Sequence, residues 1–457
     1  MALGSAAADG ADAMREQGSG LTGRALRGSA LTAGSYVIAQ GLRLASNLIL
    51  TRLLFPEAFG LMALVSVVLV GLQMFSDTGI GPAISRSPRG DEPAFLDTAW
   101  TVNVGRGVLL WLLTCALAWP LAAVWEAPEL RQLLPVAGLT LLVAGFNPTR
   151  IDTANRHLML GRLTALDLLA QVIGIAAMVA LAAVWPSVWA LVIGAVIGSA
   201  AKLALCWIGL PGQANRFRWE AMAARELIHF GKWIFLSTLC GFLLAQGDKA
   251  ILGGYLSLEA LGVYNIGYFL ASFPALLAGA VVARVMIPLY RARAEGRGGA
   301  RLNRARWALT AGVLLALAAL AFAGGPLVRL LYDDRYLAAG AIVTAVALVQ
   351  MPGIVGMTYD QSALAAGDGR GYFALIAARA AVQTLAFLAG AHWAGLGGAL
   401  LGQGLAGVAT LPLIARLARR HGVWDMRHDL SMGALALALA AGVVAANHQA
   451  LAGLFPP

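Results

Sequence analysis

The sequence is poor in charged side chains. Asp, Glu, Lys and Arg together make up 12% of its 457 residues, whereas 59% of the residues are apolar and the mean hydropathy is +0.75. Soluble domains contain roughly a quarter charged residues. The composition therefore excludes an ordinary soluble enzyme, a disordered protein and a nucleic-acid-binding domain, although the net charge is +10.

Residue patterns typical of catalysis or metal binding are also missing. The three cysteines, Cys115, Cys206 and Cys240, lie in apolar runs without CxxC or metal-ligand spacing, which favours small buried side chains. The six histidines are scattered, and the chain has no HExxH or GxSxG motif and no phosphate-binding P-loop. We therefore expect no catalytic residues, no metal site and no organic cofactor.

Long apolar runs are what the sequence does have. A membrane-spanning helix needs about 20 mostly apolar residues. Trp185-Pro186 and Ala394-Gly395 offer turns that divide two uncharged runs too long for one span. The sequence predicts an all-α integral membrane protein with 12–14 transmembrane helices, thirteen by this count. The thirteen spans are residues 31–53, 57–81, 97–124, 130–150, 163–185, 187–210, 227–254, 258–287, 307–329, 336–364, 371–392, 394–415 and 430–453.

Basic residues collect on one side of these spans. With the N-terminus inside, 22 arginines fall in inward-facing segments and 4 in outward-facing ones. Cytoplasmic loops of membrane proteins carry such an excess of positive charge, which explains the net charge. We predict a multi-pass protein with a cytoplasmic N-terminus and a disordered tail over residues 1–23. The outward loops are too short to form a large folded domain.

Two stretches of the chain are alike at an offset of 202 residues. ILTRLLFPEAFGLMALV (residues 49–65) and ILGGYLSLEALGVYNIG (residues 251–267) match at six of 17 positions, including Gly60 and Gly262. Each copy joins an outgoing helix to a returning one, and six spans separate the copies. Both halves therefore cross the membrane in the same direction, as in the parallel repeats of transporters.

The repeat predicts two six-helix lobes around a central cavity. The N-lobe covers residues 24–210, a cytoplasmic linker covers 211–225 and the C-lobe covers 226–420. An additional C-terminal helix lies within residues 421–457. The substrate site is expected between the lobes near the midplane, with alternating access by rocking.

The repeated segments carry a resemblance to a known family. LTRLLFPEAFGLMAL followed by FSDTGIGPAISR resembles the opening of Wzx-type polysaccharide flippases. FGKWIFLSTLCGFLLAQGDKAILGGYLSLEALGVYNIGYFLASFPALL resembles the start of their second half. These proteins belong to the MOP superfamily, together with the MATE drug exporters and the lipid II flippase MurJ. The resemblance covers residues 24–420.

The resemblance implies translocation of an undecaprenyl-pyrophosphate-linked oligosaccharide from the inner to the outer leaflet of the bacterial inner membrane. Such a protein supports the synthesis of a surface polysaccharide: O-antigen, capsule or exopolysaccharide. The implied partners are the lipid-linked oligosaccharide, membrane lipids and, further, a polysaccharide polymerase or glycosyltransferases, with no nucleic acid. The only cofactor to expect is a coupling ion, H⁺ or Na⁺.

Two other functions stay open at this point. A MATE-like cation-coupled drug exporter has the same architecture, but an acidic, aromatic cavity would suit its cationic substrates. The mid-span ionisable residues here are more often arginine. A membrane polysaccharide polymerase is disfavoured by the short outward loops and by the parallel repeat. We expect a transporter and not an enzyme.

One mid-span arginine is the leading candidate for substrate binding. Ionisable groups at the centre of a span are costly and usually face a cavity or a partner. Arg43 lies near the middle of the first span and shares one helical face with Tyr36, Gln40 and Asn47. Arginine suits phosphate oxygens through charge-assisted hydrogen bonds. The alternative is a structural pair with a carboxylate on a neighbouring helix.

Other charged residues inside spans form a second set of candidates. Arg106 on the third span and Arg379 on the eleventh are expected to line the cavity for the same reason. A gate or an ion-coupling role is the hypothesis for three carboxylates and one lysine, with a local cap or a structural ion pair as the alternative. These four residues are Asp77, Asp248, Lys249 and Asp360.

Overall fold

The structure, a computed structural model, describes residues 34–76, 79–231 and 235–455. The expected tail over residues 1–23 and the candidate Asp77 lie outside the described residues. Within them every regular element is a helix. The helices are one over residues 34–53, α2 (Pro56–Phe75), α3 (Ile80–Arg86), α4 (Pro93–Val124), α5 (Leu130–Gly145), α6 (Arg150–Arg156), α7 (Leu160–Val184), α8 (Val188–Gly209), α9 (Ala221–Gly231), α10 (Phe235–Leu252), α11 (Leu258–Ala294), α12 (Gly299–Leu331), the 3-10 helix η1 (Asp334–Tyr336), α13 (Ala339–Gly356), α14 (Asp360–Ala365), α15 (Gly369–Arg420) and α16 (Met426–Ala452).

Each of the thirteen predicted spans overlaps helical residues, although the spans over residues 227–254 and 336–364 each cover more than one helix. Nine helices of the described chain are long and apolar enough to cross a membrane, or ten if the bent pair α5–α6 is one crossing. The remaining predicted spans fall on the helix over residues 34–53, on α10 and on the second half of α15. The protein is therefore an all-α integral membrane protein that crosses the membrane many times, as the sequence predicts.

The two turns predicted within long apolar runs are confirmed. α7 ends and α8 begins on either side of Trp185-Pro186. The backbone of α15 leaves the helical region at Ala394 and at Gly395, where φ is 55°. Glycine tolerates a positive φ because it has no Cβ atom. α15 therefore contains two spans.

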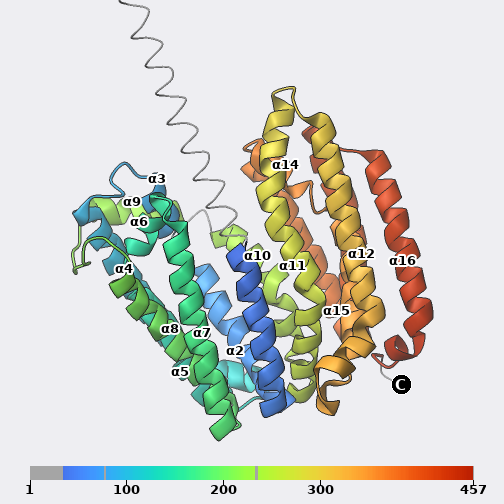
Figure 1. Ribbon diagram of the computed structural model, residues 1–457, viewed down its shortest axis with the longest axis horizontal. Helices are drawn as coiled ribbons and strands as arrows, with labels where there is room; N and C mark the ends of the chain where they lie inside the picture. Colours follow the sequence, from blue (N-terminus) through green and yellow to red (C-terminus); the bar gives the residue numbers. More distant parts are fainter. Residues whose placement is uncertain (1–33, 77–78, 232–234, 456–457) are drawn as a thin grey trace, which may run out of the picture.

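The helices form two groups that lie side by side (Figure 1). The N-terminal group runs from the helix over residues 34–53 to α9, and the C-terminal group runs from α10 to α16. The helix over residues 34–53 begins at the end of the molecule where α3, α6 and α9 lie, which we call the basic end. α16 ends at the opposite end, which we call the seam end (Figure 1). The first helix thus begins at one end of the molecule and the last helix ends at the other. This arrangement agrees with an odd number of membrane crossings.

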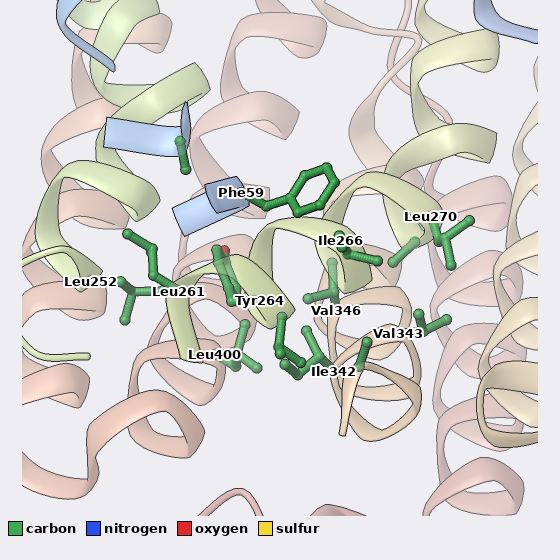
Figure 2. Packing of buried hydrophobic residues seen from close by; sticks show 14 of the residues in the cluster. Phe59, Leu252, Leu261, Tyr264, Ile266, Leu270, Ile342, Val343, Val346 and Leu400 are labelled. Carbon is green, nitrogen blue, oxygen red and sulfur yellow. The ribbon is translucent and has the colours of Figure 1, made fainter. Parts of the chain in front are cut away.

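Close apolar packing joins the two groups. α2 of the N-terminal group packs against α11 and α10 of the C-terminal group. Figure 2 shows Phe59 of α2 beside Tyr264 and Ile266 of α11, with Ile342 and Val346 of α13 behind them. Lipid tails are as apolar as these side chains, so tight van der Waals contact and not water exclusion stabilises the junction.

The basic segment between the predicted spans 258–287 and 307–329 is helical and not an extended loop. α11 continues to Ala294, and α12 already begins at Gly299. Arg291 and Arg293 occupy the last turn of α11, where positive charge interacts favourably with the helix dipole. Hydropathy locates only the apolar part of a helix, and it therefore misses how far these two helices extend beyond the membrane.

Candidate functional site

The two repeated segments meet each other at the seam end. A Cβ atom on Gly60 would lie 2.0 Å from the carbonyl oxygen of Leu258, and a Cβ atom on Gly262 would lie 1.9 Å from that of Pro56. Each residue of one contact is related to its counterpart in the other by the 202-residue offset of the repeat. A two-fold axis produces reciprocal contacts of this kind. We call these four residues the seam.

Two predicted site residues on the helix over residues 34–53 have side-chain partners. The Tyr332 hydroxyl of the C-terminal group donates to Oδ1 of Asn47 at 2.9 Å. The side-chain amide of Gln40, which is buried, donates to the Tyr36 hydroxyl at 3.3 Å. Asn47 therefore links the two groups, and Gln40 packs within its own helix.

Arg43 is exposed on the side of its helix that otherwise faces protein. Ile38 and Ile49 are exposed on the apolar side of this helix, as expected for contact with lipid. At 3.6 residues per turn, Arg43 lies on the opposite side, together with Gln40 and Asn47. Arg43 is therefore an exposed cation on the side of the helix opposite to its exposed apolar residues.

Arg106 lines a cavity of about 280 Å³ inside the N-terminal group. Its guanidinium donates to the Ser76 hydroxyl at 3.0 Å and to the Gln73 carbonyl at 3.2 Å. Two cations, one carboxylate and three amide side chains thus surround one cavity, a combination that suits a ligand with phosphate and hydroxyl groups. The other polar lining residues are Gln73 on α2, Asn103 on α4, Asn147 before α6, Asp152 on α6 and Lys202 on α8.

Two of the predicted candidates, Arg379 and Asp360, form an ion pair. Nη1 of Arg379 donates to Oδ2 of Asp360 at 2.5 Å, and both side chains are largely buried. Arg379 also lines a cavity of about 150 Å³ with Gln383 and Gln403. Its charge is therefore balanced by Asp360 within the C-terminal group.

Asp248 and Lys249 also contact each other, although they are adjacent on α10. Lys249 Nζ lies 3.8 Å from Asp248 Oδ1 and 4.8 Å from the centroid of the Tyr268 ring. The Tyr264 hydroxyl donates to Asp248 Oδ2 at 2.8 Å. Because Tyr264 belongs to the apolar cluster that includes Phe59, this charge pair lies beside the junction of the two groups (Figure 2).

Arg306 belongs to a polar site that the sequence analysis missed. The sequence places it in a loop, whereas it is fully buried on α12. Its guanidinium lies 4.4 Å from the centroid of the Tyr359 ring and donates to the Tyr290 hydroxyl at 3.1 Å. Nε and Nη1 have no hydrogen-bond partner among the described residues. Stacking on an aromatic ring stabilises such a desolvated cation.

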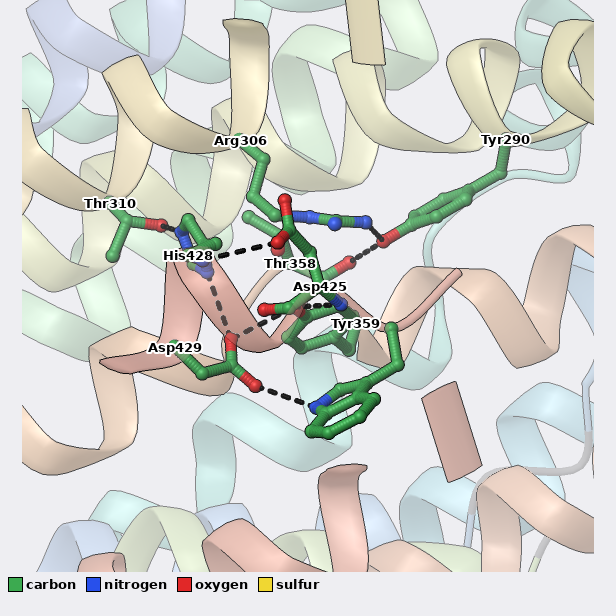
Figure 3. A network of polar contacts seen from close by, with 9 residues as sticks. Tyr290, Arg306, Thr310, Thr358, Tyr359, Asp425, His428 and Asp429 are labelled. Carbon is green, nitrogen blue, oxygen red and sulfur yellow. Dashed lines mark hydrogen bonds and ion pairs between the residues drawn. The ribbon is translucent and has the colours of Figure 1, made fainter. Parts of the chain in front are cut away.

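The same network fastens α16 to the rest of the C-terminal group (Figure 3). His428, also fully buried, lies 2.9 Å from Asp429 Oδ1 through Nδ1 and 3.2 Å from the Thr310 hydroxyl through Nε2. Asp429 accepts hydrogen bonds from the Tyr359 hydroxyl at 2.8 Å and from Trp424 Nε1 at 2.9 Å. No local sequence pattern indicates this network, because its members come from segments far apart in the chain.

The described part of the chain contains no metal-binding cluster and no disulfide bond. No group of three or more His, Cys, Asp and Glu side chains there could hold a metal ion. Cys206 and Cys240 are buried, Cys115 is partly buried, and all three are free thiols.

Comparison with known proteins relates most of the chain to polysaccharide biosynthesis. Residues 49–341 match the family model described as "Polysaccharide biosynthesis protein". The chain is 24% identical to the teichuronic acid biosynthesis protein TuaB of Bacillus subtilis, over 48% of this chain and 45% of TuaB. It is 22% identical to the lipopolysaccharide biosynthesis protein WzxC of Escherichia coli, over 58% of this chain and 54% of WzxC. The match thus spans about half the length of these relatives.

Solved membrane transporters share the fold. The lipid II flippase MurJ in its inward closed conformation superposes with a TM-score of 0.71 at 12% identity, covering 92% of this chain and 96% of MurJ. An inward-facing multidrug resistance transporter of the MATE family gives a TM-score of 0.62 at 15% identity, covering 84% and 94%. At such identities the likeness is one of fold alone.

Proposed function

Because this chain belongs to the polysaccharide biosynthesis protein family, within the MOP superfamily, we propose that it is a Wzx-type flippase. It moves an undecaprenyl-pyrophosphate-linked oligosaccharide from the inner to the outer leaflet of the bacterial inner membrane. The observation that supports this most is Arg43, a cation exposed on the protein-facing side of a membrane-spanning helix. A charge in that position suits an anionic pyrophosphate.

The cavity of the N-terminal group supplies the other contacts in this proposal. Arg106 and Lys202 attract the pyrophosphate, while the amides of Asn103 and Asn147 form hydrogen bonds with sugar hydroxyl groups. Buried hydrogen-bonding groups discriminate strongly against ligands that cannot pair with them. In this proposal the oligosaccharide end of the substrate lies in the cavity of the N-terminal group.

The charges fit an exporter of cationic drugs less well. Such a substrate needs accessible negative charge, whereas the one carboxylate that lines the N-terminal cavity, Asp152, shares it with Arg106 and Lys202. Asp360 is paired with Arg379, and Asp248 is bonded to Tyr264 with Lys249 beside it. These two carboxylates are therefore better suited to a gate or to binding a coupling ion, H⁺ or Na⁺, than to holding a cationic substrate.

The transport cycle in this proposal depends on the seam. In alternating access the cavity opens to one leaflet at a time. The groups touch reciprocally at Gly60 and Gly262, so opening at the seam end requires these contacts to separate. The protein acts as a transporter and not as an enzyme, with its N-terminus in the cytoplasm and a polymerase or glycosyltransferases as partners.

Replacement of Arg43 tests the proposal. In cells that depend on this chain for surface polysaccharide, Arg43→Ala should lower export about ten- to a hundred-fold, because a charged hydrogen bond contributes about 1.5–3 kcal/mol. Arg43→Lys should restore part of the export, since it keeps the charge but loses the planar fork. Lipid-linked oligosaccharide on the inner face and protein abundance are measured in the same cells.

Arg52→Ala is the matched control, because Arg52 is an exposed arginine of the same helix, nine residues further along the chain. It should leave export near the wild-type level. Full export by an abundant Arg43→Ala protein would remove Arg43 from the substrate site. Export of cationic dyes that depends on this chain, with no change in surface polysaccharide, would favour the drug-exporter alternative.

A further inference from the structure

Residues 211–220 form an extended segment that is tied to the N-terminal group and does not hang free between the two groups. The backbone amides of Arg216 and Arg218 donate to Asp97 Oδ1 and Thr101 Oγ1, each at 3.1 Å. The amide of Glu220 donates to Thr98 Oγ1 at 3.2 Å. The backbone amides of three alternate residues thus donate to side-chain oxygens in the first turns of α4.

Two hydrogen bonds between Asn215 and Thr149 hold the start of this segment. The side-chain amide of Asn215 donates to the Thr149 hydroxyl at 2.7 Å, and its Oδ1 accepts from the Thr149 backbone amide at 3.0 Å. After Glu220 the chain enters α9, whose Ala223 and Leu227 are buried against α3 and α4. We call residues 216–225 the strap, because they cross the basic end of the N-terminal group in a fixed path.

The strap presents large apolar side chains outward. Phe217 is 69% exposed, Trp219 is 63% exposed and Met222 is 74% exposed. The Phe217 ring also packs against Trp100, with ring centroids 4.8 Å apart and the ring planes tilted by 49°. Tryptophan and other aromatic residues gather at the boundary between membrane and water, where an amphipathic ring is favourable.

Basic side chains alternate with these apolar ones. Arg216, Arg218 and Arg225 are exposed, and no described carboxylate forms an ion pair with them. Three acidic residues near the strap pair with other cations. Glu220 and Glu92 pair with Arg89, and Asp91 pairs with Arg156 and His157. Among the ion pairs of the described residues, none involves Arg216, Arg218 or Arg225, so the strap presents these three charges outward.

We propose that the strap is a binding surface for anionic phospholipid headgroups in the leaflet at the basic end of the molecule. The arginines meet the phosphates, and Phe217, Trp219 and Met222 enter the boundary region below them. The backbone hydrogen bonds to α4 hold both kinds of side chain in place. Lipid binding here anchors the N-terminal group against the membrane while the C-terminal group moves relative to it. Lipid binding at the strap does not depend on the transported substrate, whereas its anchoring role rests on the proposed transport cycle.

Native mass spectrometry of the full-length protein with added phosphatidylglycerol or phosphatidylcholine tests the proposal. Wild-type protein should retain phosphatidylglycerol preferentially, and the preference should weaken with salt. The double variant Arg216→Gln/Arg218→Gln should lose about five-fold in affinity for each arginine removed. The strap should stay in place in this variant, because its backbone amides and not the arginine side chains bond to α4.

The matched control is Arg301→Gln/Arg304→Gln. These two arginines are exposed on α12 of the C-terminal group, and no large apolar residue lies exposed between them. The control removes the same charge and should keep most of the phosphatidylglycerol preference. If both double variants lose the same affinity for phosphatidylglycerol, the preference depends only on net charge, and this result would overturn the proposal.

A second measurement locates the lipid. Brominated phosphatidylglycerol in nanodiscs quenches nearby tryptophan, and the difference between the wild type and Trp219→Phe isolates the contribution of Trp219. Quenching of Trp219 that decreases in Arg216→Gln/Arg218→Gln supports the proposal. Absence of quenching at Trp219 would overturn the proposal. A soluble protein would then be the alternative binding partner of the strap.

Discussion

Gly60 and Gly262 lie against each other across the junction of the two groups, and each faces a carbonyl oxygen from the first turn of the other's helix. A Cβ atom would approach the carbonyl oxygen of Leu258 to 2.0 Å from Gly60, and that of Pro56 to 1.9 Å from Gly262. The two glycines are equivalent in the internal repeat, and so are the two carbonyl residues. The seam is therefore a contact that one sequence motif makes with its own copy.

A methyl group at either glycine should force the seam apart. Gly60→Ala and Gly262→Ala each place a Cβ far inside van der Waals contact with a backbone carbonyl, and overpacking of this kind costs about 1–3 kcal/mol. We expect a lower melting temperature and greater reactivity of a cysteine introduced at Pro56 toward a membrane-impermeant thiol reagent. A Cys-free background is used, because the chain has three native cysteines.

Gly279→Ala is the control for these variants. Gly279 lies on α11, as Gly262 does, and nothing lies within 4 Å of a Cβ built there. Alanine should therefore be neutral or mildly stabilising at this position, since it is the better helix former. Unchanged labelling in Gly60→Ala, together with normal stability, would show that the seam tolerates the methyl group.

Arg335 should hold the seam end closed. Its guanidinium donates to the carbonyl oxygens of Thr51 at 3.1 Å and Arg52 at 3.3 Å and pairs with Asp333. Arg335→Gln should release the last turn of the helix over residues 34–53 and raise labelling at the seam end. Arg335→Lys should have an intermediate effect, because an ammonium group cannot donate to both carbonyls and the carboxylate in the same geometry.

The Asp333–Arg335 pair also predicts a pH dependence. The hydrogen bonds from Arg335 hold the pKa of Asp333 below its ordinary value. A depressed carboxylate pKa stabilises the folded state above the unfolded pKa of about 4, and this contribution is lost as the pH falls through the folded value. The melting temperature should therefore fall below about pH 4 in the wild type and change less in Asp333→Asn.

The network around His428 should fasten α16. His428→Ala removes the groups that bond Asp429 and Thr310 and leaves a gap between Trp307 and Tyr359. We expect a loss of about 1–3 kcal/mol, seen as a lower melting temperature in detergent and faster proteolysis near α16. His448→Ala, an exposed position on the same helix, should change neither, and equal melting temperatures would contradict the role of His428.

Topology reporters test the orientation. The 22-to-4 distribution of arginines predicts cytoplasmic signals from fusions at Gly90, Gln213 and Gly298. Fusions at Pro128 and Asp333 should report the opposite side. A periplasmic signal at Gln213 would contradict the arrangement in which both halves start from the same side.

The fold could be predicted to a large extent because its signals are local. Span length follows from bilayer thickness and hydropathy, and turns follow from Trp185-Pro186 and Ala394-Gly395. The bias of basic residues and the 202-residue repeat can also be read without any three-dimensional information. The ends of α11 and α12 could not, since a helix continues past the apolar segment that reveals it.

The candidate site was predictable only in part. The spacing of Gln40, Arg43 and Asn47 predicts one shared face of a helix, and this face lies away from the exposed apolar side. Which residues have partners was not predictable, because Asn47 bonds to Tyr332, 285 positions away in the chain. The pairing of Arg379 with Asp360 joins two residues that were separate candidates in the sequence.

The sequence by itself determined the class of protein, the order of its apolar spans, and the motif that repeats. The tertiary structure alone decided that the two copies of that motif touch at Gly60 and Gly262, that Arg306 is buried, and that the strap is tied to α4. The physical reason is the range of the interactions. Hydropathy and turn preference act within a few residues, whereas a side chain finds its partner only when helices far apart in sequence pack together in the membrane.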